Sequence, residues 1–242
     1  FLFAKKLLIS TGGHPSGHRL AESLGHQIIK PVPSLFSFSC KDEKLKACRG
    51  VTVKNVYLEI YLNNKYFKSQ GDLLVTHWGF SGPGILRLSS EAARELYEKK
   101  YNFKLRIKWT NLDYVELTNR MNNLREVNGR SNLCNSRPIP SLTKRLWVYL
   151  LNKLEIDNSK TWSELFSAER IMIINILLND EYQISGKGPF ADEFVTSGGV
   201  SLDEVSLKTM ESCICKGLYF SGEVLDVDGV TGGFNFQHCW TS

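Results

Sequence analysis

Apolar and polar residues alternate from position 51 to 62, where VTVKNVYLEIYL is typical of a half-buried strand. Asn63-Asn64 predicts the turn of a hairpin that returns through residues 65–68. Beyond the hairpin, the pattern predicts strands at 72–76 and 103–109, a turn at 79–84 and a helix at 85–100. Together these segments favour a small mixed sheet or barrel that carries one helix.

The pattern changes between residues 111 and 179, where leucines recur with helical spacing. We expect helices at 113–124, 142–154 and 162–178, interrupted by the linker Arg137-Pro138-Ile139-Pro140. Leucine-rich faces of this kind are typical of a helical bundle core. Residues 182–184 are then predicted to return to the sheet.

Each end of the chain carries a short apolar run that leads into a glycine turn. Residues 7–10, LLIS, precede Thr11-Gly12-Gly13, and residues 218–220 come shortly before Gly222. Both runs are typical of buried strands, and open parallel sheets bind ligands beyond the carboxyl ends of their strands. We therefore expect the two turns to be neighbours around one ligand, although a plain surface turn explains either signal taken alone.

The stretch from residue 217 to 240 adds polar groups suited to such a ligand. Glu223, Asp226 and Asp228 supply acceptors for the hydroxyls of a sugar-like group. Gly232 and Gly233 precede a predicted helix, whose first N–H groups would face an anion. This combination favours a polyhydroxylated or phosphorylated ligand.

Composition favours a soluble globular protein and gives no sign of nucleic-acid binding. The 242 residues are 42% hydrophobic and 11% aromatic, which suits one large or two small globular domains. The net charge of +5 is modest and the Lys and Arg residues are scattered, so we expect solvated faces and no nucleic-acid partner. No apolar run approaches the roughly 20 residues that span a bilayer, which predicts a soluble protein.

Six cysteines without a C-x-x-C pair indicate free thiols in a reducing compartment, the cytoplasm or an organellar stroma. Cys213-Ile214-Cys215 and the His14/His18 pair are the closest approaches to a metal-binding pattern. The cysteine pair lacks partners at ligand spacing, and the Gly/Pro/Ser setting of the histidines favours a solvated or phosphate-facing turn. We therefore predict no metal site.

Five longer segments carry a more specific signal. They are LLISTGGHPSGHRLAESLGH, PVPSLFSF, LLVTHWGFSGPGILRLSS, GKGPFADEFVTSGGVSLDEVSLKTMES and GLYFSGEVLDVDGVTGGFNFQ. In order and wording they resemble the aminoacetone oxidase family of BaiN-like NAD(P)/FAD-dependent flavoproteins, and the compact GGHPSGH resembles its short-loop branch. The resemblance implies an FAD-dependent oxidoreductase with a small-molecule substrate and NAD(P)H as a candidate reductant.

The same resemblance implies an α/β fold: a partial Rossmann-like FAD/NAD(P)-binding domain interrupted by a β-rich, barrel-like insertion and a helical one. The FAD-binding part would comprise residues 1–33 and 192–242, the β-rich insertion 34–110 and about 180–191, and the helical subdomain 111–179. We expect the chain to be a fragment that lacks the N-terminal G-x-G-x-x-G unit. Alone, it should then retain FAD weakly and be inactive.

A G-x-G-x-x-A string occurs at Gly186, Gly188 and Ala191, and it matches the dinucleotide fingerprint. A genuine fingerprint opens a helix directly after a strand. Here Pro189 lies inside the string, and residues 193–196 are predicted to form a strand. We therefore reject it as a cofactor motif.

The resemblance also assigns FAD contacts, residue by residue. They are Thr11, Gly12 and Gly13 near the adenosine half; Gly222, Glu223 and Asp226 near the ribityl and pyrophosphate portion; Gly232, Gly233, Phe234, Asn235 and Gln237 against the flavin ring and pyrophosphate; and Thr196, Gly198, Gly199 and Val200 beside the isoalloxazine. The alternative for the last group is a tight turn between sheet strands.

His77, Trp78 and Ser81, in THWGFSGP, are candidates for a substrate pocket. A helix N-cap formed by Ser81, with Pro83 in the first turn, explains the same residues slightly better. No catalytic side chain stands out, so hydride chemistry would belong to the flavin. The alternative class is a non-catalytic binding or scaffold module that keeps the FAD-domain architecture. The sequence does not indicate an oligomeric state.

Overall fold

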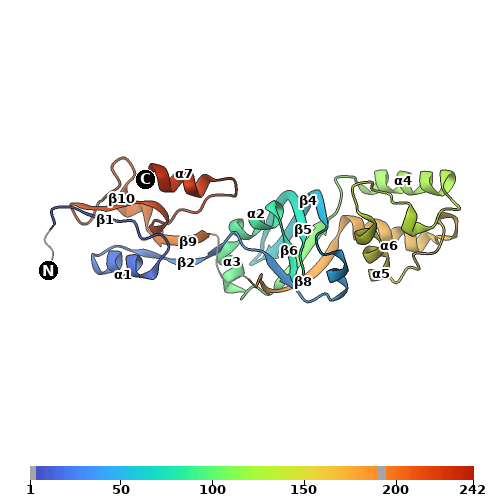
Figure 1. Cartoon of the computed structure of the whole chain (residues 1–242), viewed down its shortest axis with the longest axis horizontal. Coiled ribbons are helices and arrows are strands. Elements are labelled where there is room, and N and C mark those ends of the chain that lie inside the picture. The colour runs from blue at the N-terminus through green and yellow to red at the C-terminus, as the bar shows by residue number, and fades with distance from the viewer. Residues whose placement is uncertain (1–3, 190–194) are drawn as a thin grey trace. The chain divides into compact units, whose positions relative to one another are not determined.

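The computed structural model describes residues 4–189 and 195–242, which form two compact units. Unit 1 comprises Phe1–Phe36, Ser89–Tyr97 and Phe190–Ser242, and unit 2 comprises Ser37–Leu88 and Glu98–Pro189. Each unit is therefore discontinuous in sequence. Unit 1 combines the N-terminal and C-terminal segments, drawn in blue and red in Figure 1.

A closed barrel of six antiparallel strands, in the order β3-β6-β5-β4-β7-β8, forms the β-rich part of unit 2 (Figure 1). The strands are β3 (Phe38–Cys40), β4 (Thr52–Leu62), β5 (Lys65–Val75), β6 (Gly79–Ser81), β7 (Phe103–Lys108) and β8 (Asp180–Lys187). In β7, Phe103, Leu105 and Ile107 are buried, whereas Lys104 and Arg106 between them are exposed. Of the two arrangements expected from the sequence, a small mixed sheet or a barrel, the structure has the barrel.

The hairpin predicted around Asn63-Asn64 joins β4 to β5, with Leu62 opposite Lys65. Both asparagines have positive φ, 48° and 62°, as a two-residue hairpin turn of the primed type requires. The separate strands expected at 65–68 and 72–76 are wrong, because β5 is continuous. Gly71 lies in the middle of β5 and, lacking a side chain, lets the backbone of Gly84 approach closely.

The turn expected at 79–84 contains a strand instead, because β6 pairs with both β3 and β5. Gly79 makes this possible: its φ is 151°, and a Cβ atom there would collide with the carbonyl oxygen of Phe38. The single helix expected at 85–100 is two, α2 (Pro83–Glu91) and α3 (Ala93–Glu98). Lys100 and Tyr101 follow with positive φ, 51° and 57°, which is incompatible with a continued helix.

Three helices form the rest of unit 2: α4 (Tyr114–Val127), α5 (Lys144–Lys153) and α6 (Ser167–Leu178). Short 3-10 turns accompany them: η1 (Lys44–Cys48), η2 (Leu133–Asn135) and η3 (Trp162–Glu164). Trp147 and Trp162 are fully buried and stack with ring centroids 6.5 Å apart. The expected helix at 162–178 is divided into η3 and α6, because Phe166 is extended and its N–H is held by the Glu169 carboxylate, 2.9 Å away.

Unit 1 contains two small sheets, one in the order β1-β12-β11-β10 and one formed by β2 and β9. Its strands are β1 (Leu7–Ile9), β2 (Ile28–Ser34), β9 (Val195–Val200), β10 (Val205–Ser206), β11 (Glu211–Ser212) and β12 (Leu218–Phe220). Helices α1 (Pro15–Ser23) and α7 (Phe234–Thr241) and the 3-10 turns η4 (Leu202–Glu204) and η5 (Gly222–Val224) complete it. The chain is therefore a mixed α/β protein, with Ile9, Ala21, Val200 and Phe220 in the core of unit 1.

The first strand is less buried than the sequence suggested. Leu7 and Leu8 are 44% and 57% exposed, and only Ile9 reaches the core. Among the described residues β1 lies at the end of its sheet, with β12 as its hydrogen-bonded neighbour. The expectation of a fully buried strand is therefore wrong.

Replacing Leu105 by Ala should destabilise the protein by about 2–5 kcal/mol, because the fully buried side chain leaves a cavity inside the barrel. Urea unfolding measures this loss. Lys104→Ala is the matched control: it removes an exposed side chain with a 3.4 Å surface ion pair to Glu181, and should cost less than about 1 kcal/mol. Equal losses in the two variants would contradict the assignment of inward and outward faces.

Candidate functional site

The two glycine turns lie at the same sheet edge. Strands β1 and β12 are parallel neighbours, with Leu7 opposite Leu218 and Ile9 opposite Phe220. The Ser221 N–H donates to the carbonyl of Ile9 at 3.1 Å, so the pairing continues to the carboxyl ends of both strands. The prediction that these distant segments are neighbours is confirmed.

The Glu223 carboxylate connects the turns to strand β9. Its Oε1 accepts the backbone N–H of Thr196 at 2.8 Å. Gly13 faces the same place, since a Cβ atom there would lie 2.9 Å from Thr196 Oγ1 and 3.8 Å from the Glu223 carboxyl carbon. Gly12, with φ 62°, is next to Glu223 Oε2. The structure thus brings together the 11–13 turn, Thr196 and Glu223, and among the described residues no donor reaches Oε2.

Gly17 is a position that the sequence interpretation missed. It lies on α1 directly against the 11–13 turn, and a Cβ atom there would overlap the Thr11 hydroxyl. The absence of a side chain therefore sets how closely the helix packs on the turn. Its four-residue spacing from the buried Ala21 was the available signal in the sequence.

His18 is the second missed position. Of the solvated or phosphate-facing turn expected for the two histidines, the solvated alternative is wrong for His18. It is only 6% exposed and lies beside the backbone of Val224 and the charge of Glu223. Burial lowers the pKa of the imidazole, and the Val224 hydrogen bond and Glu223 oppose this only partly. Its Nε2 has no hydrogen-bond partner among the described residues. His18 therefore places a buried imidazole, which burial favours in its neutral form, next to Glu223 and the backbone of Val224.

The two histidines of the 14–18 loop have separate roles. His14 is the N-cap of α1, with Nδ1 accepting the Ser16 N–H at 3.2 Å, whereas His18 is buried. Over residues 4–189 and 195–242, no group of three or more His, Cys, Asp or Glu is arranged to hold a metal ion. The same ranges contain no helix with the length and apolar character needed to cross a bilayer.

The segment with Thr196, Gly198, Gly199 and Val200 is strand β9, which pairs antiparallel with β2, so the tight-turn alternative is wrong. Gly198 has φ 115°, and a Cβ atom there would lie 2.6 Å from the Lys30 carbonyl oxygen. Gly199 has φ 144° and faces the backbone of η5 equally closely. Close backbone packing thus accounts for both glycines, whether or not a ligand is bound.

Two of the predicted acceptors have partners in unit 1. Asp226 lies 3.4 Å from the Arg94 guanidinium, and its N–H donates to the Val200 carbonyl at 2.9 Å. Asp228 accepts the Ser34 hydroxyl at 3.2 Å. Burial raises the pKa of the Asp228 carboxyl, with hydrogen bonds from Ser34 and Ser197 acting against it. These acids therefore also serve internal contacts.

The 232–237 segment opens helix α7. Gly232 and Gly233 have φ 120° and 91°, no side chain caps the first turn, and the space beside Gly233 is open to 4 Å. The Asn235 amide does not point to a free ligand position: its Oδ1 and Nδ2 bond the N–H and carbonyl of Gly229 at 2.6 and 3.0 Å. Phe234 and Gln237 are exposed. The first N–H groups of α7 therefore have no side-chain cap among the described residues.

The candidates His77, Trp78 and Ser81 belong to unit 2, whereas the residues that the resemblance implies as FAD contacts belong to unit 1. The Trp78 indole donates to Ser37 Oγ at 3.3 Å, and His77 contacts its ring edge-on at 4.3 Å. Gly82, whose carbonyl accepts the Leu86 N–H, holds the N-cap position of α2, so the assignment of Ser81 as the cap is wrong. Their role in a substrate pocket stays a prediction.

The rejected G-x-G-x-x-A string begins in the barrel. Gly186 is in β8, and the Gly188 N–H donates to the Ser37 carbonyl at 2.8 Å. No helix opens at residues 186–189. Ala191 and the first two residues of the strand predicted at 193–196 lie outside the described residues.

The barrel and the helices of unit 2 match a known protein family. Residues 32–195 match the family described as HI0933-like protein barrel and H2TH domain, a range that includes the whole six-stranded barrel and helices α4 to α6. The chain belongs to this family. The resemblance expected from the sequence is confirmed at this level, while membership of the aminoacetone oxidase group and its short-loop branch stays a prediction.

Curated relatives of this HI0933-like chain include the ribosomal RNA dihydrouridine synthases of Escherichia coli K12 and Haemophilus influenzae Rd, which are 32% and 31% identical. Each alignment covers 98% of the chain and 58% of the relative. The 3-dehydro-bile acid delta(4,6)-reductase of Clostridium scindens is 28% identical over 96% of the chain and 57% of its own length. The chain thus spans less than two thirds of these relatives.

Gly17→Ala should destabilise the protein by about 1–3 kcal/mol, because the added methyl group collides with Thr11. Alanine ordinarily stabilises a helix by about 1 kcal/mol relative to glycine, so the sign of the change is diagnostic. Urea unfolding measures it. Thr11→Gly in the same background should recover part of the loss, and a stabilised single variant would disprove the contact.

Stability should fall as the pH is lowered through the ordinary pKa of histidine, about 6.5, because the unfolded chain protonates His18 there, whereas burial lowers the pKa of His18 in the folded chain. In His18→Gln this contribution is absent. The free energy of unfolding of the wild type, measured relative to that of the variant at several pH values from 7.5 downwards, should therefore decrease. A difference that stays constant with pH would show that His18 is not held neutral.

Proposed function

We propose that the complete gene product is an FAD-dependent oxidoreductase and that unit 1 supplies part of its cofactor site. The observation that carries this proposal is the meeting of the 11–13 turn, Thr196 and Glu223 at the carboxyl ends of the parallel strands β1 and β12. In open α/β sheets this is where cofactors bind. The resemblance to NAD(P)/FAD-dependent flavoproteins supports the same choice.

The residues present fit such a cofactor. Glu223 Oε2 is an available acceptor for a ribose or ribityl hydroxyl. Gly12 and Gly13 leave the backbone of the turn accessible, and the uncapped start of α7 beside Gly233 suits a pyrophosphate, since N–H groups and the helix dipole favour an anion there. FAD bound here would supply the hydride chemistry.

The chain's own contribution is positioning and electrostatics. Glu223 fixes β9 through the Thr196 N–H, so the cofactor-facing side of β9 is held against the 11–13 turn. His18, kept neutral by burial, adds no positive charge that would draw the Glu223 carboxylate away from a hydroxyl donor. Asn235 holds the loop that leads into α7.

For the reaction we propose reduction of a carbon–carbon double bond, with NAD(P)H as the electron source. Dihydrouridine is uridine with two hydrogens added, and the third relative is named a reductase. One hydride from NAD(P)H and one proton from solvent would balance this addition. Since the two relatives with the higher identities are named for ribosomal RNA, we propose a uridine in RNA as the substrate, in place of the small molecule expected from the sequence.

The test uses the complete gene product. Purified protein should show flavin absorption at about 370 and 450 nm and release FAD on denaturation. Under anaerobic conditions NADH or NADPH should bleach these bands, and a uridine-containing ribosomal RNA fragment should restore them. Recovery with an enone steroid alone would replace RNA by a small molecule, and the absence of flavin would refute the oxidoreductase and support a non-catalytic module.

Glu223→Ala should weaken FAD binding by about tenfold or more, because it removes both the Thr196 contact and the acceptor for a cofactor hydroxyl. Glu223→Gln keeps an acceptor and should lose less. Flavin fluorescence titration of the apoprotein gives the dissociation constants. Glu22→Gln, on the exposed face of α1, is the matched control and should bind FAD as the wild type does. An unchanged constant in Glu223→Ala would remove Glu223 from the cofactor site.

A further inference from the structure

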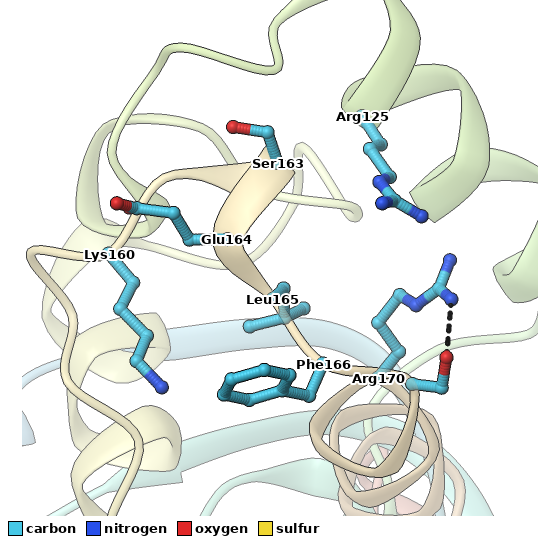
Figure 2. Close-up of a pocket in the computed structure, with 8 residues that line it drawn as sticks. Arg125, Lys160, Ser163, Glu164, Leu165, Phe166 and Arg170 are labelled. Atoms are coloured by element: carbon cyan, nitrogen blue, oxygen red, sulfur yellow. Dashed lines mark hydrogen bonds between the residues drawn. The ribbon is translucent and has the colours of Figure 1, made fainter.

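A cavity of about 630 Å³ lies in unit 2 where the end of α4, the turn η3 and the start of α6 meet (Figure 2). Arg125, Lys160, Phe166 and Arg170 line it together with Glu164. We call it the α4–α6 pocket. Its volume is in the range of sites that hold one nucleotide-sized group.

Two guanidinium groups in this pocket lack a carboxylate partner. Arg125 has no ion pair or side-chain hydrogen bond with any described residue. Among the same residues the Arg170 guanidinium bonds only the neutral Asn122 and Ser167, at 3.2 and 3.0 Å. Figure 2 shows both guanidinium groups extending into the same space. The Nε of Arg170 is buried without a partner. Like charges held together in this way favour an anion between them.

Nearby carboxylates do not neutralise this pair, because both have other partners. Glu164 accepts the N–H and hydroxyl of Thr161, each at 2.8 Å. Glu169 pairs with Lys160 at 2.7 Å. Arg106, on the barrel, shows the usual arrangement, with Glu59 and Glu181 at 2.8 and 3.1 Å. The positive charge of the α4–α6 pocket is therefore available to a ligand.

An exposed aromatic ring lies beside the two arginines. Phe166 is 68% exposed, although its backbone is fixed at the start of α6 by Glu169. Lys160 Nζ lies 5.1 Å from the ring centroid, and in Figure 2 the ring lies between Lys160 and Arg170. A flat apolar face next to phosphate-binding cations is the arrangement on which proteins stack the base of an unpaired nucleotide.

We propose that the α4–α6 pocket binds a single-stranded segment of RNA, with one phosphate between Arg125 and Arg170 and one unstacked base on Phe166. A free anion leaves the phenyl ring unexplained, and a peptide of acidic residues alone offers no flat ring to cover it. The inference rests on the proposed RNA substrate and gives that substrate a binding site within unit 2. It departs from the expectation, drawn from the sequence, of no nucleic-acid partner. The reason is that Arg125, Lys160 and Arg170 come to line one pocket only in the folded chain.

The experiment measures binding of a fluorescein-labelled, uridine-containing single-stranded RNA to the complete gene product by fluorescence anisotropy. Phe166→Ala should weaken binding about tenfold, while Phe166→Tyr, which keeps a ring, should bind as the wild type does. Arg125→Ala should weaken binding and reduce the slope of log affinity against log salt by about 0.7. Lys54→Ala, which removes an exposed positive charge from the barrel, is the matched control. Circular dichroism should be the same for all four variants.

Unchanged RNA affinity in both Phe166→Ala and Arg125→Ala would overturn the proposal. So would inorganic phosphate or polyglutamate that displaces the labelled RNA as effectively as unlabelled RNA does. The two proposals fail separately. A flavin-containing protein whose RNA affinity ignores these substitutions refutes the α4–α6 pocket alone. A protein without flavin that loses RNA on Phe166→Ala refutes the oxidoreductase alone.

Discussion

Parallel pairing of β1 with β12 is the contact on which unit 1 depends. Residues 7–9 and 218–220 form it, and it places the 11–13 turn beside η5. From there Glu223 reaches Thr196, Gly17 lets α1 close on Thr11, and His18 is buried behind them. Without this pairing the glycine turns are ordinary surface loops; with it they form one edge with a shared carboxylate.

The sequence patterns correctly predicted those elements whose structure depends on residues close together in the chain. Alternation from 51 to 62 predicted β4, and Asn63-Asn64 predicted its hairpin, because each depends on neighbours in sequence. The errors arose where contacts with backbone far away in the sequence determine the local structure. Gly79 was expected in a turn, yet its missing side chain lets strand β6 approach β3. For the site, strand-then-glycine signals predicted the meeting of Gly12 and Glu223. Gly17 and His18 were missed because their packing on Thr11 and Val224 is visible only after folding.

The positive charge of the α4–α6 pocket also could not be predicted from the sequence. A net charge of +5 spread over 242 residues gives no sign of a binding surface. What matters is that Glu164 and Glu169 are occupied by Thr161 and Lys160, which leaves Arg125 and Arg170 uncompensated. Hydrogen-bond partners, and not the count of charged residues, determine where an anion is attracted.

The discontinuity of unit 1 also sets the order in which the chain can acquire structure. Strand β1 emerges from the ribosome some two hundred residues before β12, its neighbour in the sheet. Most of unit 2 lies between them, and its barrel closes with β8 before β12 has been made. Domains fold as units during synthesis, so the barrel and its helices precede the sheet that follows. The proposed RNA-binding surface is thus complete while the proposed cofactor edge still lacks β9 and β12.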